Sequence, residues 1–189
     1  MKLLLHNKGT LFILTLWVIL FLLSPSGNFI MQLSGKGLNL IGTEYYRFLT
    51  GPLLHFNVPH LVFNAITLYW LGCFLEPQVG SVRFVVFAIA AATLAEAIYC
   101  TVFRYSEHVI GGSVCLFALM GLLMLLQILR PEVPRFMLGT WYGNWIVGYA
   151  ILGNIPMFSF TDIGTVILHI IALLTGVLLG FISVFCKLI

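Results

Sequence analysis

Charged side chains are scarce in this sequence. Asp, Glu, Lys and Arg make up only 8% of the 189 residues, whereas they make up about a quarter of a typical soluble domain. With 61% hydrophobic residues and a mean hydropathy of +1.09, the composition excludes a water-soluble globular protein of this length. The net charge of +3 is therefore no sign of nucleic-acid binding, and its distribution around a membrane is the useful signal.

Other features that the sequence lacks narrow the functional classes. The four cysteines have no Cys-x-x-Cys spacing and lie in or beside apolar runs, which argues against a disulfide framework or a metal site. No ATP-binding motif is present, so we expect an energy-independent activity without a cofactor. No internal repeat is evident, so the weak symmetry of many secondary transporters is missing as well.

Long apolar segments are what the sequence has instead. Six of them are separated by short connections, and none has the pattern of a strand. We therefore predict an all-α membrane protein with a single domain over residues 1–189, folded as a six-transmembrane-helix bundle. The expected spans are residues 9–31, 59–75, 84–103, 112–129, 141–158 and 163–186. An alternative for the first segment is a cleaved signal peptide, because lysines precede a short apolar core that ends at Ser24-Pro25.

The basic residues predict how the bundle is oriented. If the N-terminus is cytoplasmic, that side holds Lys2, Lys8, Arg83, Arg130, Arg135 and Lys187. The outer side then holds Lys36, Arg47 and Arg104. Because the side richer in lysine and arginine is normally cytoplasmic, we expect both termini inside, in the cell membrane, and the start of the fourth span near the outer face.

The most informative stretch is Gly111-Gly112-Ser113, which begins the fourth span. A helix N-terminus leaves backbone N–H groups unpaired and carries a partial positive charge, and two glycines allow another group to come close. A serine at this position therefore lies beside an oxyanion site made of backbone donors. The alternative is a small polar residue that only bonds back to its own helix or packs helix ends together.

A serine nucleophile needs a base, and histidine suits that role near neutral pH. His169, in the sixth span, is the candidate base. His60 and Asn64 are four residues apart on one face of the second span and are candidate oxyanion donors beside the Ser113 N–H. Asp162 lies two turns before His169, so we predict a dyad and not a triad. The alternative is that these polar groups only hydrogen-bond between helices.

Small residues predict that the fourth and sixth spans pack closely. They follow His169 on one face as Ala172, Gly176 and Gly180. On the fourth span, Phe117 and Gly121 follow Ser113 at steps of four. Joining the two faces would bring Ser113 and His169 together, with the Phe117 ring beside the imidazole. Helix packing alone would use the same stripe.

With these residues assembled, the sequence resembles the rhomboid family of intramembrane serine proteases over about Tyr46 to Gly180. The matching motifs are Tyr46-Arg47, then His55, His60 and Asn64, then Gly72, Glu76 and Gly80, then Gly111-Gly112-Ser113, and last His169 with Ala172, Gly176 and Gly180. They occur in the family's order and at similar spacing.

The resemblance implies a rhomboid-like bundle whose active site lies in a water-filled cavity that opens outward. It implies a Ser113–His169 dyad and an oxyanion site of His60, Asn64 and the Gly112 and Ser113 backbone. Phe117 would support the dyad. Structural roles fall to His55, Arg47, Glu76, Gly111, Gly121, Gly176 and Gly180. The partners implied are the lipid bilayer and transmembrane proteins, whose membrane segments are cut.

Three positions depart from the family's pattern. Val114 follows the serine where glycine is usual, Ala172 replaces a glycine, and Phe117 replaces a frequent tyrosine. The added bulk motivates an alternative, a catalytically inactive relative that binds membrane segments without cutting them. A small transporter is a further alternative, motivated by Glu96 within the third span and by the membrane histidines. We assign Glu96 no role.

Overall fold

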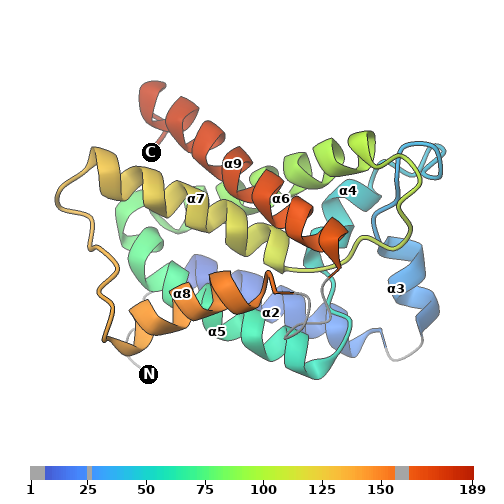
Figure 1. Ribbon diagram of the computed structural model, residues 1–189, viewed down its shortest axis with the longest axis horizontal. Coiled ribbons are helices and arrows are strands. Elements are labelled where there is room, and N and C mark those ends of the chain that lie inside the picture. The colour runs from blue at the N-terminus through green and yellow to red at the C-terminus, as the bar shows by residue number, and fades with distance from the viewer. Residues whose placement is uncertain (1–6, 25–26, 156–161) are drawn as a thin grey trace.

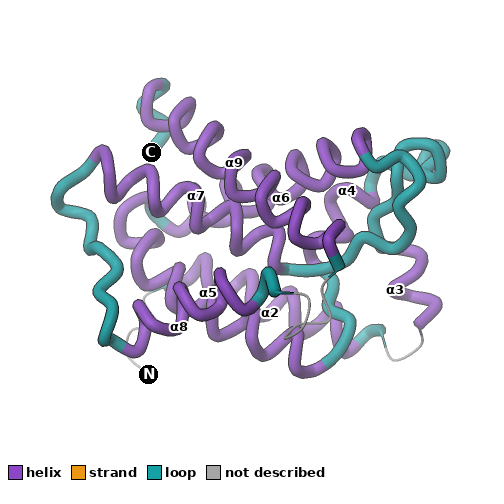
Figure 2. Tube along the Cα trace, viewed as in Figure 1, coloured by secondary structure: helices purple, strands orange, loops and turns teal. Residues whose placement is uncertain are grey.

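The computed structural model describes residues 7–24, 27–155 and 162–189 of the chain, and these are mostly helical (Figures 1 and 2). The longer helices are α2 (Lys8–Leu22), α5 (Val58–Val79), α6 (Ser81–Val102), α7 (Ser113–Leu129), α8 (Trp141–Leu152) and α9 (Ile163–Phe185). The short ones are α3 (Gly27–Leu33), α4 (Arg47–Thr50) and the 3₁₀ turn η1 (Gly51–Leu53). Within the described ranges the only extended pairing is one bridge between Gly35 and Val109. The predicted all-α membrane bundle is confirmed.

Each of the six predicted spans overlaps one of the longer helices, and the first also covers most of α3. By length and composition, α5, α6 and α9 are able to cross a membrane. Helices α2 and α7 are also apolar but shorter, with 15 and 17 residues. The helix α8 is shorter still, with 12 residues.

The helices run back and forth between two ends of the molecule. The left-hand side of Figure 1 holds the start of α2, the junction of α5 and α6, and the ends of α7 and α9. Helices α3 and α4, the start of α7 and the start of α9 lie toward the opposite side. The functional residues predicted at the beginnings of α5, α7 and α9 are therefore gathered toward one end of the bundle.

Helix α7 is the centre of the bundle. Every residue from Ser113 to Leu123 is buried, as expected for a helix that is apolar on all sides. Its closest neighbour is α9, and glycines permit the contact. A Cβ atom on Gly121 would collide with the Leu173 carbonyl oxygen, and one on Gly176 with the Ala118 carbonyl oxygen. The predicted stripe of small residues therefore lies where the two backbones touch.

Two predicted helix boundaries that lie beside prolines are wrong. The first segment is not one helix over residues 9–31, because α2 ends at Leu22 and α3 begins separately at Gly27. Ser24 precedes a proline, which disfavours helical backbone at that residue. The second span does not end before Glu76-Pro77, because α5 continues to Val79 with Pro77 inside it. Pro77 removes the one hydrogen bond that its own nitrogen would donate to the Cys73 carbonyl oxygen, and the helix continues for only two residues after it.

The fifth helix is also shorter than predicted. We expected a span over residues 141–158, whereas α8 ends at Leu152 and is followed by a turn. Residues 156–158 lie outside the described ranges. Gly153 follows the last residue of the helix, and glycine is a poor helix former that favours an end at this point.

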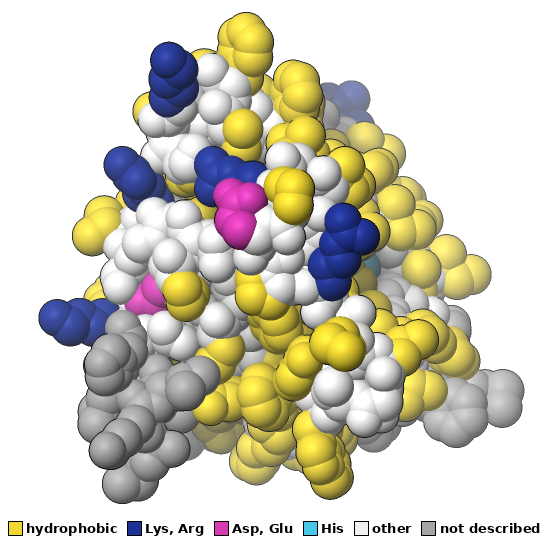
Figure 3. All heavy atoms as spheres, turned by 90° about the vertical axis from the view of Figure 1, so that its left-hand side faces the viewer, with side chains coloured by type: hydrophobic (Ala, Val, Ile, Leu, Met, Phe, Trp, Pro, Cys, Tyr) yellow, Lys and Arg dark blue, Asp and Glu magenta, His cyan; other side chains and the backbone are white. Residues whose placement is uncertain are grey.

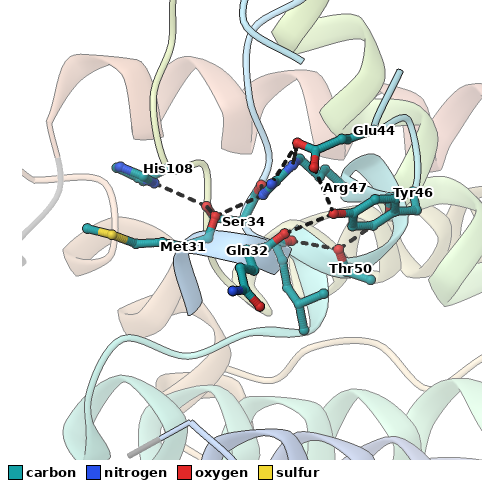
Figure 4. Close-up of polar contacts among 9 residues, drawn as sticks. Met31, Gln32, Ser34, Glu44, Tyr46, Arg47, Thr50 and His108 are labelled. Carbon is teal, nitrogen blue, oxygen red and sulfur yellow. Dashed lines mark hydrogen bonds and ion pairs between the residues drawn. The ribbon is translucent and has the colours of Figure 1, made fainter. Parts of the chain in front are cut away.

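Arg47, the first residue of α4, joins that helix to the end of α3 and the residue after it (Figure 4). The buried guanidinium donates to the carbonyl oxygens of Met31 at 2.8 Å and Ser34 at 3.1 Å, and it pairs with Glu44 at 2.7 Å. Thr50 Oγ1 donates to the Leu33 carbonyl at 2.6 Å. These bonds tie α3 to α4.

Glu76 joins three helices at the opposite end. Its buried carboxylate accepts hydrogen bonds from the backbone N–H groups of Gly9 (2.7 Å) and Thr10 (2.9 Å) at the start of α2. It also accepts from the hydroxyls of Thr10 (2.8 Å) and Ser81 (2.5 Å). An acceptor at a helix N-terminus satisfies unpaired donors and complements the helix dipole.

Replacing Glu76 with glutamine should therefore destabilise the protein. All four partners are donors, and an amide NH₂ group offers them no acceptor. We expect a loss of about 2–3 kcal/mol in the free energy of unfolding, measured as a lower thermal midpoint in detergent. Glu132→Gln, at an exposed position, is the matched control and should melt like wild type. Equal midpoints for Glu76→Gln and wild type would contradict this role.

Candidate active site

Ser113 is the first residue of α7, and the two glycines before it are required by their surroundings. Gly111 has φ +147°, a conformation that residues with a side chain rarely adopt. A Cβ atom on Gly112 would lie 2.7 Å from His55 Nε2 and 2.7 Å from a ring carbon of Trp17. Glycine therefore lets the start of α7 lie directly against the His55 and Trp17 rings. The Ser113 N–H belongs to the first turn, where no helical carbonyl is available.

The structure brings Ser113 and His169 into hydrogen-bond contact. Ser113 Oγ and His169 Nε2 are 2.9 Å apart, and both side chains are buried. The Phe117 ring is stacked on the imidazole, with ring centroids 4.1 Å apart and an interplanar angle of 14°. The predicted neighbours on α7 and α9 thus lie in the arrangement that the small-residue stripe suggested.

The second nitrogen of His169 has a partner that we did not predict. His169 Nδ1 lies 2.9 Å from Asn154 Oδ1. Asp162 does not play this part, because it caps the start of α9, where its side chain accepts from the Thr165 N–H at 2.7 Å. These hydrogen bonds from Thr165 lower the Asp162 pKa. The only sequence signal for Asn154 was its place among the residues that interrupt the fifth apolar segment.

Asn64 lies at the centre of a second polar chain. Its Nδ2 contacts His55 Nε2 at 3.1 Å, and its Oδ1 accepts from the Tyr149 hydroxyl at 2.6 Å. Burial lowers the pKa of His55 to about 3, so this ring is neutral near pH 7 and its Nε2 accepts from the amide. One amide hydrogen of Asn64 remains for another acceptor. Tyr149, on α8, was not predicted.

His60 lies beside the same glycine turn. A Cβ atom on Gly111 would be 3.1 Å from His60 Cε1 and 3.2 Å from Ser113 Oγ. The His60 and His55 rings meet edge to face, with centroids 5.2 Å apart. The Asn57 side chain accepts from the His60 N–H at 2.8 Å and thereby caps α5. His55, His60 and Asn64 are thus gathered around the start of α7.

Val114 and Ala172, the two residues that are bulkier than the family's usual glycines, do not separate the Ser113 and His169 side chains. Val114 and Ala172 are both buried, and the 2.9 Å contact forms with both present. Phe117 in place of tyrosine keeps the stacked ring and omits only a hydroxyl. The bulk added by Val114 and Ala172 therefore does not hold α7 and α9 too far apart for the contact between Ser113 and His169.

Glu96 is a buried residue of α6, and it is well separated in the sequence from the residues described above. Its carboxyl group lies so close to Gly35 and Gly51 that a Cβ atom on either would collide with Oε1. Within the described part of the chain, neither carboxyl oxygen has a hydrogen-bond partner. In the same ranges, no three His, Cys, Asp or Glu side chains are placed so that they could hold a metal ion.

Comparison with known proteins identifies the family. The Rhomboid domain model matches residues 42–185, which include all the residues described in this section except Gly35 and Trp17. The chain belongs to the rhomboid family. It is 26% identical over 179 residues to a protein named as a rhomboid protease, YdcA of Bacillus subtilis (strain 168), a match that covers 92% of this chain and 87% of YdcA.

A second relative matches over a shorter stretch. The rhomboid protease GlpG of Enterobacter sp. (strain 638) is 32% identical over 95 residues, which is 50% of this chain and 33% of GlpG. Membership of the rhomboid family agrees with the resemblance that the motifs suggested. It also makes this chain a membrane protein of a family to which both relatives above are assigned by the name rhomboid protease.

Proposed function

We propose that this rhomboid protein is an intramembrane serine endopeptidase in which Ser113 is the nucleophile and His169 the general base. The observation that carries the proposal is the 2.9 Å contact between Ser113 Oγ and His169 Nε2 at the start of a buried helix. A hydroxyl is a weak nucleophile until an adjacent base accepts its proton. The substrates are transmembrane proteins whose peptide chain is cut within or beside the membrane segment.

The first half of the reaction transfers an acyl group to Ser113. Oγ attacks the carbonyl carbon of the scissile peptide bond, and the hydroxyl proton passes to His169 Nε2. The carbonyl electron pair moves onto its oxygen. When the tetrahedral intermediate collapses, the C–N bond breaks and His169 gives its proton to the leaving nitrogen. The Phe117 ring keeps the imidazole in the plane needed for both transfers.

The negative charge on the substrate oxygen requires donors beside Ser113. The Ser113 N–H in the first turn of α7, the Gly112 backbone, the remaining Asn64 amide hydrogen and the His60 ring supply them. Tyr149 and His55 hold the Asn64 amide in one orientation, which prepares the site before the charge forms. One such donor typically contributes about 3 kcal/mol to transition-state stabilisation.

The second half of the reaction releases the acyl group. Water attacks the ester carbon, His169 Nε2 accepts a water proton, and the Ser113 oxygen leaves with that proton. Hydrolysis therefore restores both residues, and no energy source is needed.

The distribution of basic residues favours both termini in the cytoplasm. Figure 3 looks onto the end of the bundle where α7 and α9 finish, and Lys and Arg side chains are spread over it. Lys8, Arg83, Arg130 and Lys187 begin or follow helices at that end. The start of α7 then faces the outer side, so the active site opens toward the outer half of the cell membrane.

Cleavage by the wild-type protein separates this proposal from an inactive relative. We expect the purified protein in liposomes to cut a transmembrane reporter within or beside its membrane segment, with Ser113→Ala as the inactive control. Val114→Gly, which restores the family's usual residue, should change the rate by less than about tenfold, because Val114 does not part the dyad. A silent wild type together with an active Val114→Gly variant would instead establish the inactive relative.

A further inference from the structure

We infer that Asn154 is a positioning residue for His169, so that the base is held in a Ser113–His169–Asn154 chain. This inference rests on the proposed protease function. Asn154 Oδ1 lies 2.9 Å from His169 Nδ1, on the side of the ring opposite the contact to Ser113. Among the described residues, the Asn154 side chain hydrogen-bonds to His169 and Ala150 and not to Ser113, so it acts through the imidazole.

The orientation of the Asn154 amide is determined by its other end. Its Nδ2 donates to the Ala150 carbonyl oxygen at 2.7 Å. Since only the NH₂ end of an amide can donate, the oxygen is the atom that faces His169. An amide oxygen can only accept, and therefore Nδ1 of His169 carries the hydrogen.

The position of that hydrogen decides whether His169 is able to act as a base. In a neutral imidazole one nitrogen donates and the other accepts. With the hydrogen on Nδ1, the lone pair is on Nε2 and faces the Ser113 hydroxyl at 2.9 Å. The opposite tautomer would present an N–H group to the hydroxyl and could not accept its proton. Asn154 therefore selects the tautomer that the reaction requires.

The three contacts to the imidazole come from two different segments, α7 and the turn after α8. Ser113 and Phe117 belong to α7, and Phe117 covers one face of the ring. Asn154 follows the end of α8, and its own N–H donates to the Ile151 carbonyl oxygen at 3.1 Å. The imidazole has little freedom to turn while Asn154 is in place. A neutral amide supplies the acceptor without placing a carboxylate charge inside the membrane, which would be costly.

The test compares two substitutions that separate the two hydrogen bonds of Asn154. Asn154→Leu has a similar size and removes both the acceptor for His169 and the donor to Ala150. Asn154→Asp keeps an acceptor for Nδ1, loses the donor to Ala150 and adds a carboxylate charge beside the His169 N–H. Asn144→Leu is the matched control, because Asn144 lies on α8 and its side chain accepts from the Gly139 N–H, away from His169.

We expect Asn154→Leu to lower kcat for a transmembrane reporter by about 10- to 100-fold, while KM changes by less than about threefold. Asn154→Asp should retain kcat within about fivefold of wild type, as should Asn144→Leu. The rate at which a fluorophosphonate labels Ser113 should fall in Asn154→Leu and stay close to the wild-type rate in Asn154→Asp and Asn144→Leu. Thermal midpoints of all variants show whether a loss reflects unfolding, and Asn154→Ala replaces the leucine variant if that one fails to fold.

Two results would overturn the inference. One is a kcat for Asn154→Leu within about threefold of wild type. The other is an equal loss for Asn154→Asp and Asn154→Leu, which would mean that the bond to Ala150 matters and the acceptor does not. Failure of the proposed function looks different, because wild type and Ser113→Ala would then be alike in cleavage and in labelling.

Discussion

Replacing His169 with alanine should lower the rate of reporter cleavage by about 10³-fold or more. The imidazole is the only base in contact with Ser113 Oγ among the described residues, at 2.9 Å. Without it the hydroxyl proton has no acceptor during attack, and the leaving nitrogen has no donor during collapse. The oxyanion donors remain in the variant, so a small residual rate is expected.

The measurement is the initial rate of cleavage in liposomes, at substrate concentrations that give kcat and KM separately. His108→Ala is the matched control, because His108 is exposed and contacts Ser34, away from the active site. It should cleave at the wild-type rate. Because His169 also stacks on Phe117, the thermal midpoint of His169→Ala must be recorded as well. A folded His169→Ala variant that cleaves within about tenfold of wild type would rule out the proposed base.

Gly176→Ala should lower both the stability of the protein and its rate of cleavage, although the substitution adds only one methyl group. The new Cβ atom would collide with the Ala118 carbonyl oxygen, which is backbone and cannot turn aside. Helices α7 and α9 must then move apart, and they carry Ser113 and His169. Overpacking of this kind typically costs about 1–3 kcal/mol of stability. A displacement of about 1 Å at a catalytic pair can reduce the rate by about 100-fold.

Gly148→Ala is the control for this prediction. Gly148 lies within α8, and apart from the adjoining backbone of its own helix no atom of the described residues is within 4 Å of the place that its Cβ would occupy. Since alanine favours helix by about 1 kcal/mol over glycine, this variant should be as stable as wild type or more so. The comparison uses thermal midpoints and cleavage rates of both variants. A Gly176→Ala protein that matches Gly148→Ala in both would show that the close helix contact is unimportant.

Much of the site could be predicted because its residues have strong local signals. Ser113 follows two glycines at a helix start, and His169 begins a stripe of small residues. Each could therefore be recognised from its neighbours in the sequence. The helices were predictable from apolar runs long enough to cross a bilayer. The contact between α7 and α9 then followed from the need of small residues to pack against another backbone.

The residues of the site that were not predicted, Asn154 and Tyr149, lack such local signals. Asn154 lies beyond the end of α8, where no periodic pattern indicates which way a side chain points. Tyr149 looked like an ordinary membrane aromatic, and only its 2.6 Å hydrogen bond to Asn64 distinguishes it. The end of α5 was not predicted because the rule that a proline ends a helix is local. It cannot anticipate that Glu76 anchors the last turn of α5 to the starts of α2 and α6.

Labelling with a serine-directed fluorophosphonate tests the central claim most directly, because the reagent reports an activated hydroxyl and needs no known substrate. We expect it to modify the wild-type protein at Ser113, as located by mass spectrometry of the labelled peptide. Ser113→Ala should not be labelled, and His169→Ala should be labelled far more slowly than wild type, since its hydroxyl lacks the partner now 2.9 Å away. Equal labelling of wild type and Ser113→Ala would contradict the account.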